Sequence, residues 1–211
     1  MLKIEKTVLP SPEQWEIIIE GMRNPMNSWE KSDSLCAYDG AFILGEADHK
    51  LMSKLAKGGA VHAKYRRMIP VFLTINAPLY WWKEFDTYKV GTVCNSCSTM
   101  HKIHEKEFTL DDFSHEHLSG GEYGNIELLK AGITCLNVAR EEFLETKDKT
   151  AWWQMIQFLP SSYNQKRTIM LNYEVLVNIY HSRKNHKLDE WRTFCEWIES
   201  LPHSELITGG E

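Results

Sequence analysis

Four side chains of the types that bind metals or perform thiol chemistry lie in one short segment: Cys94, Cys97, His101 and His104. A structural zinc site needs four such ligands around the ion, usually from two elements separated by a longer loop. The spacings here are three, four and three residues, which on a helix would place all four along one stripe that cannot surround an ion. We therefore expect no metal here. The remaining interpretations are a helical face of small residues and a reactive CxxC thiol pair.

Cations and amides lie beside apolar positions in the segment from 159 to 191. At about 100° per residue, Asn172 and Arg183 are separated by about three helical turns along the border of an apolar face. That face consists of Ile169, Tyr173, Leu176, Ile179 and Tyr180.

Lys166 and Arg167 lie near the start of the same expected helix, where an anion would be stabilised. Burying cations and amides unpaired is costly, so these groups need partners. A phosphate or a pyrimidine edge would serve, and so would a carboxylate of the protein. Spacing alone favours the carboxylates, which are Glu174, Asp189 and Glu190.

This region resembles the second half of the flavin-dependent thymidylate synthases. That family has a Leu-Pro pair, then a tyrosine and a basic residue, then asparagine, asparagine and arginine at fixed spacings. The matching residues here are Pro160, Tyr163 (one position early), Lys166, Asn172, Asn178 and Arg183. Residues 128–144 (LLKAGITCLNVAREEFL) also resemble the helix before the Leu-Pro pair.

The family's signature, R-H-R-x-x-S-x-N-x-x-S-x-R, aligns with residues 88–100 (YKVGTVCNSCSTM). Asn95 and Ser98 match it. The replacements are Tyr88, Lys89 and Val90 for the leading Arg-His-Arg, Val93 for the first serine and Met100 for the closing arginine. Residues 72–90 also resemble the family's approach to the signature, so the resemblance covers most of the chain from about residue 35.

The resemblance implies a mixed α/β domain that forms a homotetramer. It implies that flavin adenine dinucleotide (FAD) binds where subunits meet, with deoxyuridine monophosphate stacked on its ring. Reduced flavin, recharged by NADPH, and methylenetetrahydrofolate would supply the methyl group of thymidylate.

By position, the resemblance assigns residues to both ligands. Those expected to contact flavin are Asn95, Asn172, Asn178 and Lys89. Those expected to hold the nucleotide are Ser98, Lys166, Arg167 and Arg183. Arg183 is the expected catalytic residue, because a guanidinium near the pyrimidine would stabilise negative charge on the activated ring.

The replaced signature residues favour an alternative function. Lys89 keeps a charge but not the bidentate fork of an arginine, and Met100 removes a charge-assisted phosphate contact. Losing several contacts worth about 1.5–3 kcal/mol each would weaken ligand binding severely unless other residues replace them. The candidate replacements are Arg167, Lys102 and His101, with Tyr88 and the Trp81–Trp82 pair able to stack on a ring. The alternatives are a non-catalytic nucleotide-binding protein on the same scaffold and a partner-binding protein without a small ligand.

The expected elements give a single helix-rich α+β domain over residues 1–211. Ser11, Pro12 and Gln14 form a capping box that predicts a helix from residue 12. The other expected helices are 47–57, a short one to 67, one from 78, and then 125–145, 151–158, 165–184 and 187–201. Residues 68–75 predict a buried strand, residues 24–39 a loop, and residues 87–98 fit no single pattern.

Composition narrows the classes of function. With 43% hydrophobic and 25% charged residues, the 211-residue chain has ordinary globular usage. Its net charge of −5 disfavours a nucleic-acid binder. We expect no membrane span and no secretory signal, hence a cytoplasmic protein, whose five cysteines are reduced thiols.

Overall fold

The computed structural model describes residues 1–122 and 124–209. Its main sheet has the strand order β1 (Lys3–Val8), β4 (Pro70–Pro78), β6 (Asn164–Asn172) and β5 (Val93–Ser96). A second sheet pairs β2 (Leu35–Cys36) with β3 (Phe42–Ile43) in antiparallel register. The α-helices are α1 (Pro12–Arg23), α2 (Glu46–Lys57), α3 (Leu79–Phe85), α4 (Asn125–Thr146), α5 (Lys149–Phe158), α6 (Tyr173–Arg183), α7 (Asp189–Glu199) and α8 (Glu205–Thr208). Short 3₁₀ helices are η1 (Asn24–Met26), η2 (Trp29–Lys31), η3 (Lys64–Met68) and η4 (Leu110–Asp112). The predicted helix-rich α+β class is confirmed.

The chain divides into two compact units, each made of several segments. The first unit comprises Met1–Ile4, Ile75–Thr87 and Asn95–Arg167, and the second comprises Glu5–Thr74, Tyr88–Cys94 and Thr168–Glu211. The single domain over residues 1–211 stays a prediction. No helix within the described ranges is long and apolar enough to cross a membrane.

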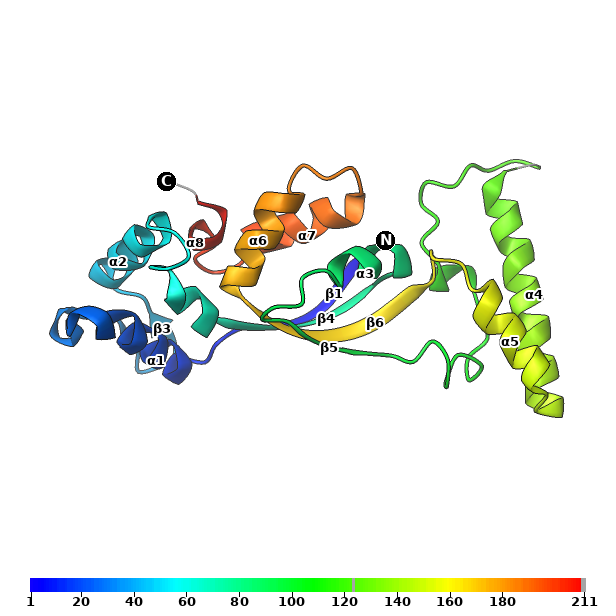
Figure 1. The fold of residues 1–211 in the computed structure, drawn as a ribbon, viewed down its shortest axis with the longest axis horizontal. Coiled ribbons are helices and arrows are strands. Elements are labelled where there is room, and N and C mark those ends of the chain that lie inside the picture. The colour runs from blue at the N-terminus through cyan, green and yellow to red at the C-terminus, as the bar shows by residue number, and fades with distance from the viewer. Residues whose placement is uncertain (123, 210–211) are drawn as a thin grey trace. The chain divides into compact units, whose positions relative to one another are not determined.

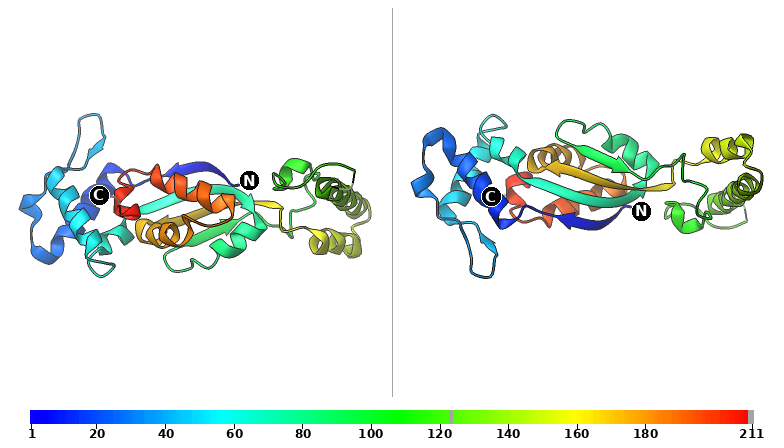
Figure 2. Two further views of the ribbon diagram at one scale, coloured as in Figure 1. Left: turned by 90° about the horizontal axis from the view of Figure 1, so that it is seen from above. Right: turned by 90° about the horizontal axis from the view of Figure 1, so that it is seen from below.

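The first unit is built around the helix pair α4 and α5, which lie side by side (Figure 1, Figure 2). Both helices were predicted, with ends that differ by one or two residues. The α4 and α5 side chains Ile133, Leu136, Ala139 and Met155 are buried together with Ile103, Phe108 and Phe113. Burial of one such large apolar side chain contributes about 1.5–3 kcal/mol to stability.

In the second unit, α6 and α7 lie on one face of those parts of the main sheet that belong to this unit (Figure 1, Figure 2). The backbone N–H of Tyr173, the first residue of α6, donates to the Ile69 carbonyl at 3.2 Å, which fixes the start of the helix beside β4. The apolar faces of both helices are fully buried, through Leu176 and Ile179 on α6 and Trp191 and Phe194 on α7.

The N-terminal part of the second unit confirms the predicted start of α1. Ser11 accepts a hydrogen bond from the Gln14 backbone N–H at 3.4 Å, and Gln14 Oε1 accepts one from the Ser11 N–H at 2.9 Å. This is the expected capping box, with Pro12 in the first turn. Residues 24–39 were expected to be loop, and they contain two 3₁₀ turns and strand β2.

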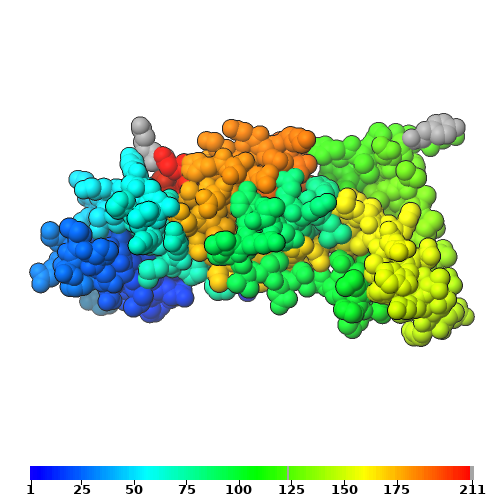
Figure 3. Space-filling view, in the orientation of Figure 1, coloured from blue at the N-terminus to red at the C-terminus, as the bar shows by residue number. Residues whose placement is uncertain are grey.

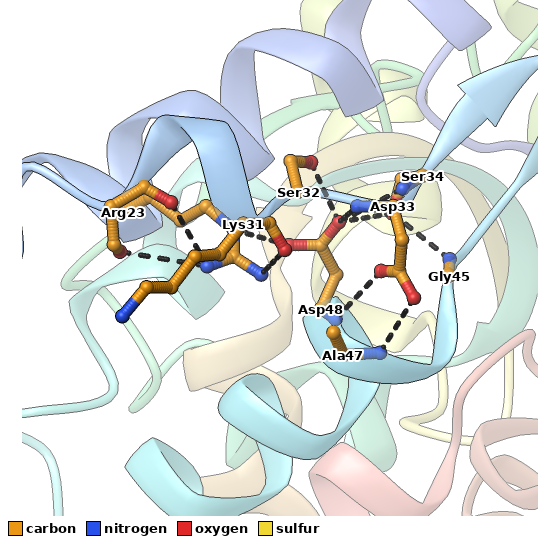
Figure 4. Close-up of polar contacts among 9 residues, drawn as sticks. Arg23, Lys31, Ser32, Asp33, Ser34, Gly45, Ala47 and Asp48 are labelled. Atoms are coloured by element: carbon orange, nitrogen blue, oxygen red, sulfur yellow. Dashed lines mark hydrogen bonds and ion pairs between the residues drawn. The ribbon is translucent and has the colours of Figure 1, made fainter.

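A buried ion pair joins α1 to α2 in this unit (Figure 4). Arg23 Nε donates to Asp48 Oδ1 at 2.6 Å, with side chains 4% and 0% exposed. The second Asp48 oxygen accepts from the hydroxyls of Ser32 and Ser34, both at 2.7 Å, and from the Ser34 N–H at 3.0 Å. Desolvation by burial raises the pKa of Asp48, but hydrogen bonds from Ser34, Ser32 and Arg23 outweigh it, so the pKa lies below its ordinary value.

The loop ahead of α2 is fixed by Asp33 in the same cluster. Its carboxylate accepts the backbone N–H groups of Ala47 at 2.8 Å and Asp48 at 3.1 Å, at the start of the helix (Figure 4). Gly45 passes so close that a Cβ atom there would lie 2.1 Å from Asp33 Oδ1. The cluster therefore holds the end of α1, residues 31–34 and the start of α2 in one arrangement.

The predicted helix 165–184 is wrong in its first half. Residues Asn164–Asn172 form strand β6, and the helix begins only at Tyr173. Gln165, Ile169 and Leu171 are buried while Lys166 and Thr168 are exposed, which is largely the alternation of a strand. The expected position of Lys166 and Arg167 at a helix start is corrected with it, because both lie on β6. The expected separation of Asn172 and Arg183 by about three helical turns is confirmed, since Asn172 caps the start of α6 and Arg183 is its last residue.

The segment with the CxxC motif is also not helical. Cys94 lies on β5, Cys97 follows the strand, and His101 and His104 lie in bends and turns. Cys94 and Cys97 are exposed free thiols. The interpretation as a helical face of small residues is therefore wrong.

Candidate functional site

Arg183 is held against two aromatic rings at the end of α6. Its Nε donates a hydrogen bond to the Tyr88 hydroxyl at 2.9 Å. The guanidinium carbon lies 4.8 Å from the ring centre of Trp191 and 5.7 Å from that of Tyr88. Both rings lie within the roughly 6 Å over which an aromatic face attracts a cation. The predicted catalytic arginine therefore has a fixed position in an aromatic corner of the second unit.

The turn between α6 and α7 creates this corner. The sequence from Ser182 to Lys187 (SRKNHK) is polar and reverses the chain, and Asp189 starts α7 with Trp191 in its first turn. The indole of Trp191 is 0% exposed, and the Tyr88 ring packs edge-on against it with centroids 6.0 Å apart.

Asn172 caps α6 at the opposite end from Arg183. Its Oδ1 accepts the Val175 backbone N–H at 3.1 Å, as an N-cap side chain does. The loop from Tyr88 to Thr92 passes close to this cap. A Cβ atom at Gly91 would lie 3.1 Å from Val175 Cγ2 and 3.2 Å from Asn172 Nδ2, and its φ of 79° also favours glycine. Gly91 thus lets the signature segment approach the helix start.

Two other predicted flavin contacts of the second unit lie on its surface. Asn178 is exposed on α6, and Lys89 is exposed in the loop that begins with Tyr88. The structure therefore presents the predicted residues of this unit along α6 and the adjoining loop, with Arg183 and Asn172 at opposite helix ends.

In the first unit, Arg167 is the centre of a second polar group. Its Nη1 donates to Asp86 Oδ1 at 2.7 Å and its Nε to Gln165 Oε1 at 2.9 Å. Its guanidinium carbon lies 4.5 Å from the ring centre of Trp82. Asp86, which sequence reasoning missed, balances the charge of Arg167. The Arg167 side chain is 13% exposed.

The position of Arg167 follows from hydrogen bonds along β6. The Trp82 indole N–H donates to the Gln165 carbonyl at 2.8 Å, which fixes α3 against this strand. Gln165 Nε2 donates to the Cys97 carbonyl at 2.6 Å, and the Cys97 N–H donates to the Lys166 carbonyl at 2.9 Å. These bonds place residues 95–98 beside residues 165–167.

The remaining predicted residues of the first unit surround this pairing. Lys166 is exposed on β6, and Asn95 is exposed on β5. The Ser98 hydroxyl accepts the backbone N–H groups of Met100 at 3.2 Å and His101 at 2.8 Å. Ser98 therefore stabilises the turn after β5, and its hydroxyl proton is still available for donation.

Sequence reasoning named Tyr88 only as a ring that could stack, and it missed Trp191 and Asp86 as partners. Two of these contacts join residues distant in sequence: Tyr88 is 95 residues from Arg183, and Asp86 is 81 residues from Arg167. A periodicity argument cannot join residues so far apart. Of the three carboxylates proposed as alternative partners, Glu174 pairs with Arg66 at 2.9 Å and Asp189 pairs with Arg192.

Comparison with known proteins identifies the fold of the chain. No protein-family model matches the chain, and no curated protein matches it by sequence. Among solved structures, it is similar to the flavin-dependent thymidylate synthase ThyX from Helicobacter pylori, complexed with FAD and dUMP. The TM-score is 0.63 at 16% identity, covering 98% of this chain and 96% of that one. It is also similar to the UMP/dUMP methylase PolB from Streptomyces cacaoi, bound with 5-Br dUMP, with a TM-score of 0.62 at 13% identity and 99% and 94% coverage.

These similarities run through nearly the whole of each chain and include the α+β arrangement described above. They agree with the fold that the resemblance implies. The chain has the fold of the flavin-dependent thymidylate synthases.

Proposed function

We propose that this protein is a divergent flavin-dependent enzyme that methylates, or otherwise alkylates, the pyrimidine ring of deoxyuridine monophosphate. The observation that carries the proposal is the fixed guanidinium of Arg183, 2.9 Å from the Tyr88 hydroxyl and 4.8 Å from Trp191. The resemblance assigns this position to the arginine at the pyrimidine. The solved structures of the same fold, ThyX and PolB, are described with dUMP and 5-Br dUMP respectively.

Arg183 has the chemistry that this role needs. A guanidinium stays charged at neutral pH and donates several hydrogen bonds in a rigid plane. Held in advance by Tyr88 and Trp191, it would stabilise negative charge on the ring oxygens without reorganising during the reaction. Arg183 is accordingly both the proposed catalytic residue and a substrate-binding residue.

The residues proposed for the phosphate are those that the resemblance assigns to it. Lys166 and Arg167 are the cations of this set, and Ser98 offers a hydroxyl donor beside them. Arg167 is the better organised of the two, because Trp82 and Asp86 hold its guanidinium plane. Phosphate binding by this arginine then competes with its ion pair to Asp86.

The flavin contacts are proposed from the resemblance. Exposed Asn95, Asn178 and Lys89 offer amide and ammonium donors, and the Asn172 amide nitrogen lies beside the glycine turn at Gly91. Bound flavin would supply the reducing equivalents of the reaction, recharged by NADPH, with methylenetetrahydrofolate as the one-carbon donor. The chain's own residues would bind and orient the ligands.

A homotetramer is part of this proposal. Large apolar side chains are exposed on α4 and α5, where Leu128 is 72%, Val138 59% and Phe158 55% exposed. Exposed apolar patches of this kind mark interaction surfaces. A further copy of the chain is the partner that the family resemblance favours.

The alternative is a non-catalytic nucleotide-binding protein on the same fold. The replaced signature favours it, because neutral Tyr88 contacts Arg183 where the family has an arginine. Val90 and Met100 likewise remove side chains that serve cofactor and phosphate.

The test is the visible absorbance spectrum of the purified protein, before and after incubation with FAD and gel filtration. We expect a retained oxidised-flavin spectrum, and formation of a 5-alkylated nucleotide from deoxyuridine monophosphate when NADPH and methylenetetrahydrofolate are added. A protein that takes up no flavin but binds the nucleotide would support the alternative. A protein that binds neither would overturn both.

A further inference from the structure

Three potential metal ligands from two segments of the second unit lie close together. His49 lies on α2, His203 lies just before α8, and Glu205 is the first residue of α8. One ligand atom from each lies within 4.8 Å of the other two, and across residues 1–122 and 124–209 this is the one such group of three or more His, Cys, Asp or Glu side chains. The Cys94–His104 cluster is not part of it.

The distances between these atoms are close to those of a bound ion. A tetrahedral zinc site with ligand bonds of about 2.0–2.1 Å separates its ligand atoms by about 3.3 Å. His49 Nε2 lies 2.7 Å from Glu205 Oε1, and His203 Nδ1 lies 3.8 Å from the same oxygen. The first distance must lengthen and the second must shorten by about half an ångström to match that geometry, and the ligand atoms of His49 and His203 lie within 4.8 Å of each other.

The backbone holds His203 in an unusual conformation that directs it to this point. Its φ is 56°, in the left-handed region, where residues other than glycine are uncommon. The edge of its ring packs against Trp15, with centroids 5.7 Å apart. The structure thus maintains a strained residue whose side chain faces Glu205, and such strain concentrates at functional sites.

Hydrogen bonding within the protein satisfies only part of the cluster. His49 and Glu205 are at hydrogen-bond distance, whereas the 3.8 Å between His203 Nδ1 and Glu205 is too long for one. Two neutral imidazoles and one carboxylate carry a single negative charge, so a divalent cation would be favoured and would contact all three. The side chains are 40%, 31% and 35% exposed in the order His49, His203, Glu205, so an ion can reach them.

We propose that His49, His203 and Glu205 form a Zn²⁺ site that joins α2 to α8. Two imidazole nitrogens and a carboxylate suit zinc rather than magnesium or calcium, which prefer oxygen ligands. Water completes the coordination in the fourth position. The two helices lie side by side at the surface in Figure 3, α2 in cyan and α8 in red, so the ion clamps the C-terminal helix to the N-terminal part of the unit. This site is separate from the residues of the proposed function and does not depend on it.

The test is zinc titration of the metal-free protein by calorimetry, with melting temperature as a second readout. We expect one zinc ion per chain. At a free zinc concentration about 100-fold above the dissociation constant, the melting temperature should rise by about 5 °C or more. His49→Gln and His203→Asn should each weaken zinc binding at least about tenfold. Asparagine tolerates the left-handed backbone at position 203, so the second variant should fold even if the first does not.

His181→Gln is the matched control, because His181 is an exposed histidine on α6 of the same unit. It should bind zinc as the unmodified chain does, and so should the double variant Cys94→Ser, Cys97→Ser. Zinc binding that survives both His49→Gln and His203→Asn would overturn the proposal. So would binding that is lost with the two cysteines, or the absence of any stoichiometric binding.

Discussion

Arg183 and Tyr88 form a hydrogen-bonded pair, with the arginine Nε 2.9 Å from the tyrosine hydroxyl. In the resemblance to the flavin-dependent thymidylate synthases, Tyr88 stands at the position of the signature's first arginine, and Arg183 stands at the position of the arginine proposed to contact the pyrimidine. The replacement of a cation by a phenol thus removes one charge and gives the remaining arginine a neutral hydrogen-bond acceptor.

Tyr88→Phe tests this pairing. The variant keeps the ring against Trp191 but leaves Arg183 Nε without this acceptor, so the guanidinium is less restricted. We expect affinity for deoxyuridine monophosphate to fall about three- to tenfold, since a hydrogen bond to a charged group contributes about 1 kcal/mol or more. The measurement is a calorimetric titration with the nucleotide.

Tyr180→Phe is the control for that variant. Tyr180 lies on α6, as Arg183 does, and its hydroxyl donates to Glu199 at 2.7 Å, but it is not among the proposed site residues. Its loss should leave nucleotide affinity unchanged. Equal affinities for the Tyr88→Phe and unmodified proteins would show that Tyr88 does not position Arg183 for the ligand.

Asp86→Asn tests whether Arg167 serves the phosphate. The Asp86 carboxylate is about half exposed and competes with a phosphate for Arg167. Removing this partly exposed ion pair should raise nucleotide affinity about two- to fivefold at low salt, and the gain should shrink as salt rises. Glu107→Gln makes the same charge change at another exposed carboxylate of the first unit. If both variants raise affinity equally, the effect comes from net charge and Arg167 has no special role.

Asp48→Asn tests the buried ion pair with Arg23. The substitution leaves the Arg23 guanidinium buried without its anion, so we expect the free energy of unfolding to fall by about 3 kcal/mol. Urea unfolding at neutral pH measures this. Asp39→Asn is the control, because Asp39 is exposed. Its Oδ1 accepts the Ala41 N–H, and asparagine keeps an oxygen that can accept this hydrogen bond.

The pH dependence of stability gives a second readout for Asp48. Its pKa is lowered in the folded state, so its stabilising contribution is fully present above the ordinary aspartate pKa of about 3.9 and is lost as pH falls through the lowered folded value. The unmodified protein should therefore lose more stability than Asp48→Asn as pH falls from about 5 to about 2. Parallel pH profiles for the two proteins would contradict this account.

Local signals predicted much of the fold. The capping box of Ser11 and Gln14 gives the start of α1 because it is a contact within one turn. The helical spacing in residues 125–158 gives α4 and α5 to within two residues. The run from 68 to 75 gives β4, although the strand extends from Pro70 to Pro78.

The failures have a physical cause in long-range pairing. The residues of β6, NQKRTIMLN, combine apolar and polar positions in a way that fits a helix or a strand, and a short run cannot distinguish them. Pairing in the sheet selects the strand conformation, since β6 lies between β4 and β5. Strand β1, the contact of Arg183 with Tyr88 and the contact of Arg167 with Asp86 were missed for the same reason: they depend on residues distant in sequence.

The central claim is that Arg183 binds a pyrimidine nucleotide in a flavin-loaded protein. The most direct measurement is calorimetric titration of deoxyuridine monophosphate into the protein incubated with FAD, comparing the unmodified chain with Arg183→Gln and with the exposed control His181→Gln. The account predicts saturable binding that Arg183→Gln weakens at least about tenfold, the equivalent of about 1.4 kcal/mol, and that His181→Gln leaves unchanged. No binding by the unmodified protein, or the same affinity in Arg183→Gln, would contradict it.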